Sequence, residues 1–420
     1  MMSQLNKQIT RNQGIGLLAT TLLGTGVFIL PQLTVSVAGY NALYSWSGLT
    51  IAILPIVWAF AKLASLYSHA AGPAYFVEQA FGSQAGRVIG LLFVCAVPIG
   101  AAAAMMMVME FMQLMFEFSA TQAFYTQLLL LFSIWLLNIK GIKLSATIQL
   151  TLTLLITALV IVLIGAFSID SPLPSSDRAS PIDVSLVLVA ASIAFWSFLG
   201  IEAVSHFSAE FKNPQQDFVP AMLIGTLLVG LLYIACVWLV LAQPESEESA
   251  MVSAFDYLFS QGGRWAIGIL GVTAGLATIN VYVGGVARLC WSLANESVMP
   301  KFLSTLNQHQ VPQNAANTVT LVMALVIVCQ FILGISFEIF LSWTNGVFVV
   351  IYAASMLAAC KLLAKKYLLA SLCGLTTCLA IGIGLAENML YAFSVALVIY
   401  PLVALQSKRH QRKSLVGLKQ

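Results

Sequence analysis

Segments of about 20 predominantly apolar residues follow one another along the whole chain, and only short polar stretches separate them. A helix that crosses the hydrocarbon core of a bilayer needs about 20 such residues. Charged residues make up 8% of the 420 residues, whereas soluble globular domains carry about 25%. The pattern predicts an all-α polytopic membrane protein that forms one membrane domain over residues 1–420 and leaves no stretch for a soluble domain.

The apolar segments divide into twelve expected transmembrane spans. Their orientation follows from lysine and arginine, because these residues concentrate in the cytoplasmic connections of membrane proteins. With both termini in the cytoplasm, every one of the 19 lysines and arginines except Arg178 and Arg264 falls on the cytoplasmic side. An odd number of spans would lose this segregation. We expect the spans at residues 13–37, 43–66, 87–112, 123–139, 145–168, 185–207, 219–242, 265–288, 315–335, 338–360, 367–385 and 387–405.

Composition argues against several other functions. The seven cysteines lie in or near apolar segments, and no pair has CxxC spacing, so we expect no disulfide, no metal and no cofactor. The four histidines do not form the cluster that an intramembrane enzyme would need. The net charge of +3 is explained by membrane topology, so nucleic acid is not an expected partner.

The first expected span contains Gly24-Thr25-Gly26 near its middle. Each glycine inside a helix costs about 1 kcal/mol relative to alanine, so the helix is weak at this point. One interpretation is a helix break at a ligand site. The other is a close helix crossing, because small residues let membrane helices approach one another.

The sixth expected span contains the stretch from Phe195 to Glu202, which places a glycine and a carboxylate inside an apolar run. An ionisable residue at membrane depth indicates a functional site. Two interruptions at matching places in the two halves of a chain are typical of a transporter's substrate site. Glu202 is either a gating or proton-linked carboxylate, or a structural one that accepts N–H bonds from an unwound helix. His206 would share its helix face.

Five motifs occur in a characteristic order: Gly24 to Phe28, Gly72 to Tyr75 with Ala80 to Gly82, Phe195 to Glu202, Lys212 to Pro214 with Pro220, and Arg288 to Pro300. Together they resemble the amino acid, polyamine and organocation transporters over nearly the whole chain. Within this family, the chain is most similar to bacterial exporters of L-methionine and branched-chain amino acids. Asn345-Gly346, polar and small residues in the tenth span, belong to this narrower resemblance.

The resemblance implies a fold of two inverted repeats, residues 13–168 and 185–360. Two appended spans follow in residues 367–405, and residues 406–420 form a cytoplasmic tail. The first span of each repeat is expected to be discontinuous. Half-helix N-termini offer N–H groups to a carboxylate and half-helix C-termini offer carbonyls to an ammonium, so such a site suits an amino acid zwitterion.

The resemblance also assigns a substrate site. The carboxylate is expected at the first break, the ammonium at backbone carbonyls of both breaks, and an aromatic wall on the eighth span. Small residues of the third span, including Gly100, are expected to face the substrate side chain. The substrate-binding residues are Leu22, Gly24, Thr25, Gly26, Trp196, Leu199, Gly200 and Tyr282.

Trp196 and Glu202 are the expected gate and coupling residues. Trp196 would close the outer side of the site. The lysine that replaces a sodium ion in some relatives has no counterpart between Thr147 and Phe167. Proton coupling through Glu202 and uncoupled exchange both remain open.

The expected function is export of methionine, leucine, isoleucine and valine across a bacterial inner membrane by alternating access. Import or exchange is the alternative within this class, and a non-transporting nutrient sensor is the alternative from another class. The expected partners are the amino acid, the lipid bilayer and, with proton coupling, protons. The sequence leaves monomer and homodimer open.

Overall fold

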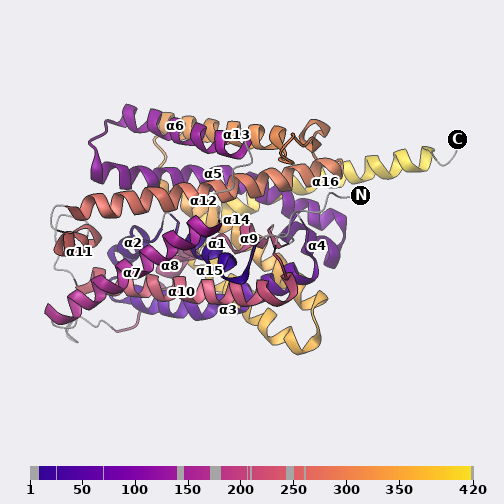
Figure 1. Cartoon of the computed structure of the whole chain (residues 1–420). Coiled ribbons are helices and arrows are strands. Elements are labelled where there is room, and N and C mark those ends of the chain that lie inside the picture. Colours follow the sequence, from indigo (N-terminus) through magenta and orange to yellow (C-terminus); the bar gives the residue numbers. More distant parts are fainter. Residues whose placement is uncertain are drawn as a thin grey trace.

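The computed structural model describes residues 9–24, 26–69, 71–139, 146–170, 181–205, 207–208, 211–242, 250–259 and 262–417. Across these ranges the backbone is almost entirely helical, and its β contacts are limited to an isolated bridge between Ile9 and Phe211. The long helices run roughly along one direction and form a single bundle (Figure 1). Helices suit a bilayer because they satisfy their own backbone hydrogen bonds.

Nine helical stretches among the described residues are long and apolar enough to cross a membrane. The chain is therefore a multi-pass membrane protein. Large apolar side chains on the outside of the bundle, such as Leu369 and Leu397, are about three-quarters exposed, as expected of a surface that faces lipid. The long helices are α3 (Asn41–Leu66), α5 (Ser83–Met115), α6 (Ala120–Ile139), α7 (Ala146–Asp170), α10 (Pro214–Ala242), α12 (Gly263–Asn295), α13 (Gln313–Leu333), α14 (Phe337–Leu362), α15 (Leu368–Leu385) and α16 (Met389–Gly417).

Two helices are interrupted where the sequence predicted breaks. The first stops as α1 at Leu23 and the chain resumes as α2 at Leu30, with Gly24 and Gly26 in the gap. Thr25 lies outside the described residues. The second consists of α8 (Val184–Ala194), the short 3-10 helix η2 (Phe195–Phe198) and α9 (Ile201–Ser205). The bounds of α1 and α2 are Arg11–Leu23 and Leu30–Ala38.

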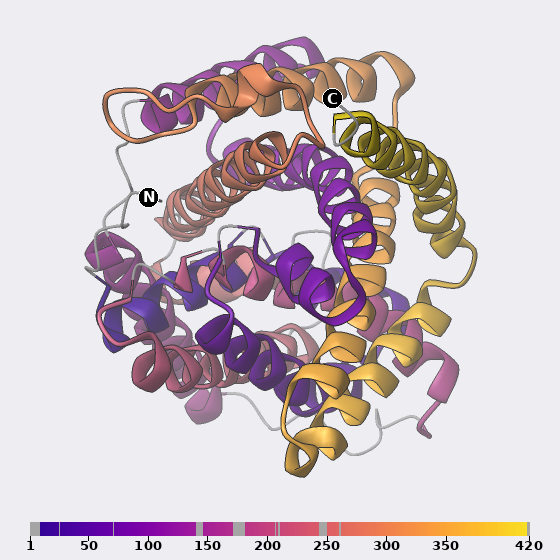
Figure 2. The same cartoon turned by 90° about the vertical axis from the view of Figure 1, so that its right-hand side faces the viewer.

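The interrupted helices occupy the middle of the bundle. α1 packs against α7, α10 and α12, while α8 packs against α3 and α15. In the view along the bundle, α6 and α13 lie side by side at one edge, next to α5 and α12 (Figure 2). Of the described Asp, Glu, Lys, Arg and His side chains, Glu202 is the one that is buried. The breaks are therefore enclosed by the apolar core.

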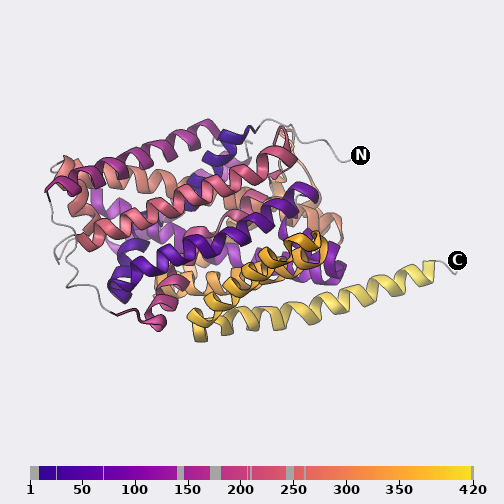
Figure 3. The ribbon, with the colours of Figure 1, turned by 90° about the horizontal axis from the view of Figure 1, so that it is seen from below.

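Three elements lie outside the expected spans or extend them. The short helix α4 (Pro73–Phe81) lies between the second and third expected spans. The helix α11 (Ala250–Phe259) was not predicted from the sequence. α16 continues to Gly417, beyond residue 405 where its span was expected to end, and it projects from the bundle (Figure 3). α4 and the end of α16 lie at one end of the bundle, and α11 lies at the other (Figure 1).

Candidate functional site

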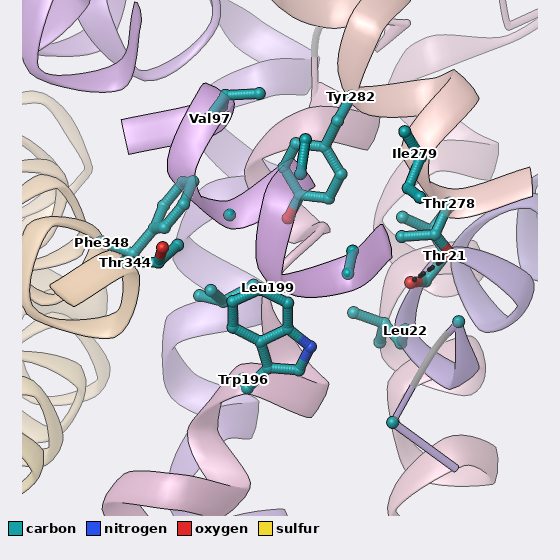
Figure 4. A pocket seen from close by; sticks show the side chains of 15 residues that line it. Thr21, Leu22, Val97, Trp196, Leu199, Thr278, Ile279, Tyr282, Thr344 and Phe348 are labelled. Atoms are coloured by element: carbon teal, nitrogen blue, oxygen red, sulfur yellow. Dashed lines mark hydrogen bonds between the residues drawn. The ribbon is translucent and has the colours of Figure 1, made fainter. Parts of the chain in front are cut away.

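A small cavity lies where the two helix breaks meet (Figure 4). Of the eight predicted substrate residues, Thr25 lies outside the described residues and Gly200 is not on the cavity wall. The other six line the cavity: Leu22, Gly24, Gly26, Trp196, Leu199 and Tyr282.

The remaining wall comes from α5, α12 and α14. Gly100 from α5 was expected there, and the structure places it on the wall with two alanines of the same helix. The other lining residues were not assigned to the site from the sequence. The full set of additional residues is Thr21, Val97, Gly100, Ala101, Ala104, Thr278, Ile279, Thr344 and Phe348.

A threonine from α12 lies against the end of α1. Thr278 Oγ1 lies 3.3 Å from the carbonyl oxygen of Thr21 and 3.4 Å from that of Thr20, so the hydroxyl lies within reach of both. Gly24 follows with a φ of +32°. A Cβ atom at Gly24 would lie 2.6 Å from Thr278 Oγ1, so a side chain there would displace this contact.

A tyrosine from α10 holds the same break from another side. The Tyr233 hydroxyl lies 3.2 Å from the carbonyl oxygens of both Leu22 and Leu23. The Tyr233 ring stacks on Trp46 at 4.4 Å between centroids, and Trp46 Nε1 donates to Thr34 of α2 over 2.9 Å. Each carbonyl oxygen has two lone pairs, so the predicted ammonium acceptor on Leu22 keeps accepting capacity beside Tyr233.

The second break is centred on Gly200, which has a φ of +128°. This backbone conformation is essentially restricted to glycine. The Gly200 N–H donates to the Glu202 carboxylate, with distances of 3.1 Å to Oε1 and 3.0 Å to Oε2. Gly200 therefore shapes the break through its backbone, while its neighbours Trp196 and Leu199 reach the cavity wall.

Glu202 lies behind the cavity and joins three helices. Its Oε1 accepts a hydrogen bond from the Tyr282 hydroxyl of α12 over 2.8 Å, and its Oε2 accepts one from the Tyr352 hydroxyl of α14. The Tyr352 hydroxyl also lies 3.3 Å from the carbonyl oxygen of Phe198. Because Tyr282 also lines the cavity, one side chain connects the carboxylate to the site.

The polar groups on the cavity wall are hydroxyls, the Trp196 indole and backbone groups, and the fifteen lining residues include no Asp, Glu, Lys, Arg or His. In Figure 4, Trp196 lies at one side of the cavity and Tyr282 at the opposite side. Among the described residues, no cluster of His, Cys, Asp or Glu side chains is suited to hold a metal ion. The wall is therefore suited to a neutral ligand.

The start of the chain before α1 and the chain after α9 are also tied together away from the cavity. Arg11, at the start of α1, pairs with Asp217 of α10 at 3.0 Å. The Lys212 N–H donates to the Ile9 carbonyl oxygen over 2.9 Å, which forms the isolated β bridge next to Phe211. The segment before α1 is thus bound to the segment that follows α9. His206, the other titratable group predicted near here, lies outside the described residues.

Sequence reasoning missed Tyr233, Tyr352 and Thr278, which organise the breaks. The residues around Tyr233 do not indicate its role, because its partner Leu22 lies 211 residues away in the chain. Thr344 had a weak signal, because it precedes Asn345-Gly346 at membrane depth in an otherwise apolar helix. These contacts become visible only when the helices are assembled.

An interrupted-helix bundle around a small neutral cavity defines a membrane transporter for small molecules. The chain belongs to the amino acid permease family, which matches it over residues 13–412. This confirms the family resemblance seen in the sequence motifs.

Individual relatives extend over nearly the same length. The chain is 36% identical to the L-methionine/branched-chain amino acid exporter YjeH of Escherichia coli K12, over 93% of this chain and 94% of that protein. It is 26% identical to the uncharacterized amino acid permease YecA of Bacillus subtilis, over 96% and 95%. It is 22% identical to the branched-chain amino acid permease BcaP of Lactococcus lactis, over 76% and 74%.

Proposed function

We propose that this chain is a secondary transporter that exports neutral apolar amino acids, namely L-methionine, leucine, isoleucine and valine, from the cytoplasm. The observation that carries the proposal is a cavity between two helix breaks whose wall holds no charged side chain. The E. coli relative, named as an exporter of these amino acids, supports the substrate class and the direction.

In this proposal, the substrate zwitterion binds to the backbone of both breaks. Its carboxylate lies at Thr25 and Gly26, ahead of the half-helix α2, because the N-terminus of a helix carries a partial positive charge. Its ammonium lies at the carbonyls of Leu22 and the stretch from Trp196 to Leu199. The close approach of Thr278 to Gly24 supports this arrangement, because it leaves no room for a side chain that would cover the backbone.

The proposed architecture has twelve spans in two inverted repeats, residues 13–168 and 185–360, followed by two further spans. Nine candidate stretches among the described residues support this count. Lys365–Gln406 contains both α15 and α16, which makes ten, and α7 with the interrupted α1–α2 pair makes twelve. An even number, with lysine and arginine at one end, supports cytoplasmic termini in a bacterial inner membrane.

Glu202 is the proposed coupling residue, and its carboxyl group has hydrogen-bond partners both when it is ionised and when it is protonated. When the carboxylate is ionised, Tyr352 donates to it. When it is protonated, it can donate to the Tyr352 oxygen, and Tyr352 can turn its proton to the Phe198 carbonyl, 3.3 Å away. Neither state leaves a buried polar group without a partner, which lowers the cost of changing protonation in the core.

The test is the flux of labelled methionine in proteoliposomes with and without a pH gradient. Wild type is expected to move methionine, and Gly26→Leu to lose transport, because a Cβ at Gly26 would already lie 2.9 Å from the Tyr233 hydroxyl. Glu202→Gln is expected to exchange substrate without responding to the gradient. A wild type that moves no neutral amino acid overturns the proposed function. A Glu202→Gln variant with full proton-driven flux overturns the coupling role alone.

A further inference from the structure

Thr344 places a buried hydroxyl on the cavity wall without a hydrogen-bond partner. Its side chain is 2% exposed, and Oγ1 bonds to no group of the described chain. Threonines in helices commonly donate to the carbonyl four residues earlier, as Thr21 and Thr226 do here at 2.6 and 2.8 Å. Thr344 lacks this bond, and a buried polar group without a partner is unfavourable. The folded chain therefore leaves this hydroxyl free for a ligand.

The position of Thr344 indicates which part of a ligand it meets. Thr344 and Phe348 lie on the wall opposite Thr21, Leu22 and Thr278, which belong to or contact the first break (Figure 4). A substrate whose carboxylate and ammonium bind to the breaks directs its side chain across the cavity. Thr344 is thus placed at the side-chain end.

Gly100 keeps space in front of this hydroxyl. A Cβ atom at Gly100 would lie 2.9 Å from Thr344 Cγ2 and 3.5 Å from Thr344 Oγ1. Any larger residue at position 100 would press on the threonine and cover it. The pair forms a small pocket end with apolar surfaces and one hydroxyl.

We propose that Thr344 makes the site prefer methionine over other apolar amino acids by donating its hydroxyl proton to the thioether sulfur. This inference rests on the proposed function, since it assumes that apolar amino acids bind in the cavity. Methionine sulfur is a weak hydrogen-bond acceptor, whereas leucine, isoleucine and valine side chains have no acceptor. The apolar walls accept all four side chains, and Thr344 distinguishes the one that carries an acceptor.

The experiment compares methionine with norleucine, which replaces the sulfur by a methylene group and keeps the length of the side chain. Both compete with labelled leucine for uptake into proteoliposomes that contain wild type, Thr344→Val or Thr344→Ser. Wild type is expected to prefer methionine by about threefold, the effect of one weak hydrogen bond. Thr344→Val keeps the shape but removes the hydroxyl, so methionine and norleucine are expected to compete equally well in this variant. Thr344→Ser is expected to retain the preference for methionine.

Three results would overturn the inference. In the first, wild type treats methionine and norleucine alike. In the second, Thr344→Val lowers the affinity for methionine, norleucine and leucine by the same factor. The hydroxyl would then contact the zwitterionic part of the substrate or have a structural role. In the third, wild type transports no apolar amino acid, and the proposed function then fails together with the inference. If Thr344→Val does not fold, a wild type that treats methionine and norleucine alike still overturns the inference.

Discussion

Gly200 lies directly against Thr21, so the two helix breaks touch each other at the centre of the bundle. A Cβ atom at Gly200 would lie 2.7 Å from Thr21 Cγ2 and 3.3 Å from Leu22 Cδ2. Thr21 is fixed in turn, because its hydroxyl donates to the Leu17 carbonyl over 2.6 Å. Neither break can change shape without affecting the other, which suits a site that must open alternately to the two sides of a membrane.

The contact between the breaks predicts that Gly200→Ala loses transport. The new methyl group would collide with Thr21, and the φ of +128° is unfavourable for alanine, at a cost on the order of 1–3 kcal/mol. Gly48→Ala is the matched control, because a Cβ there would meet no atom within 4 Å. Thermal unfolding and methionine flux check both variants. Wild-type transport by Gly200→Ala would show that the close approach is not required.

Tyr352→Phe is expected to destabilise the protein by about 1–3 kcal/mol. The variant removes a hydroxyl that lies between the Glu202 carboxylate and the Phe198 carbonyl, and buried acceptors that lose a donor pay a desolvation cost. Tyr125→Phe is the control, because Tyr125 is 64% exposed. The measurement is thermal unfolding of the purified protein in detergent. Equal stability of the two variants would contradict a structural role of the Tyr352 hydroxyl.

Gly100→Ala is expected to reduce transport of methionine and leucine by about tenfold relative to transport of free alanine, whose side chain is a single methyl group. The added methyl group would lie 2.9 Å from Thr344 Cγ2, and overpacking of this kind costs about 1–3 kcal/mol. Competition against labelled substrate measures the effect for each amino acid. Gly382→Ala is the control, since its nearest neighbour would lie at 3.7 Å, an ordinary contact. A uniform loss for all three substrates would argue against Gly100 as the end of a side-chain pocket.

The burial of His69 predicts that the folded protein loses stability in acid. It lies between α3 and α4, where its ring stacks on Tyr75 and its Nδ1 accepts the Ala71 N–H over 3.1 Å. Burial lowers the pKa of His69 below its ordinary value, which is about 6.5. The unfolded chain therefore binds more protons than the folded protein as pH falls below about 6.5, and stability falls until pH drops below the folded pKa.

The measurement is the unfolding temperature of wild type and His69→Gln between about pH 5 and pH 8, a range that spans the ordinary pKa of histidine. His69→Gln is expected to lose part of the pH dependence, because the titrating group is gone. His309→Gln, in an exposed loop, is the control. Identical pH profiles for wild type and His69→Gln would show that His69 does not contribute.

The sequence alone determined the class of the protein and the positions of its two breaks. Hydrophobic length is a local property, so the apolar segments predicted helices such as α3 and α14 to within a few residues, although α12 and α16 extend further than expected. The glycines of Gly24-Thr25-Gly26 and Gly200 also carry local information, because they weaken a helix wherever the helix packs. The family followed from five motifs in order, and the match over residues 13–412 confirms it.

The tertiary structure decided what holds the breaks and what surrounds them. Tyr233 reaches Leu22 across 211 residues of sequence, and Tyr352 reaches Glu202 across 150. Such contacts depend on how helices are rotated and paired. A membrane helix is apolar on all its faces, so its hydropathy does not indicate which face packs against which other helix. From the sequence, Glu202 was an isolated carboxylate in an apolar run. Only the assembled bundle surrounds it with hydroxyl donors and brings Thr344 to the cavity wall.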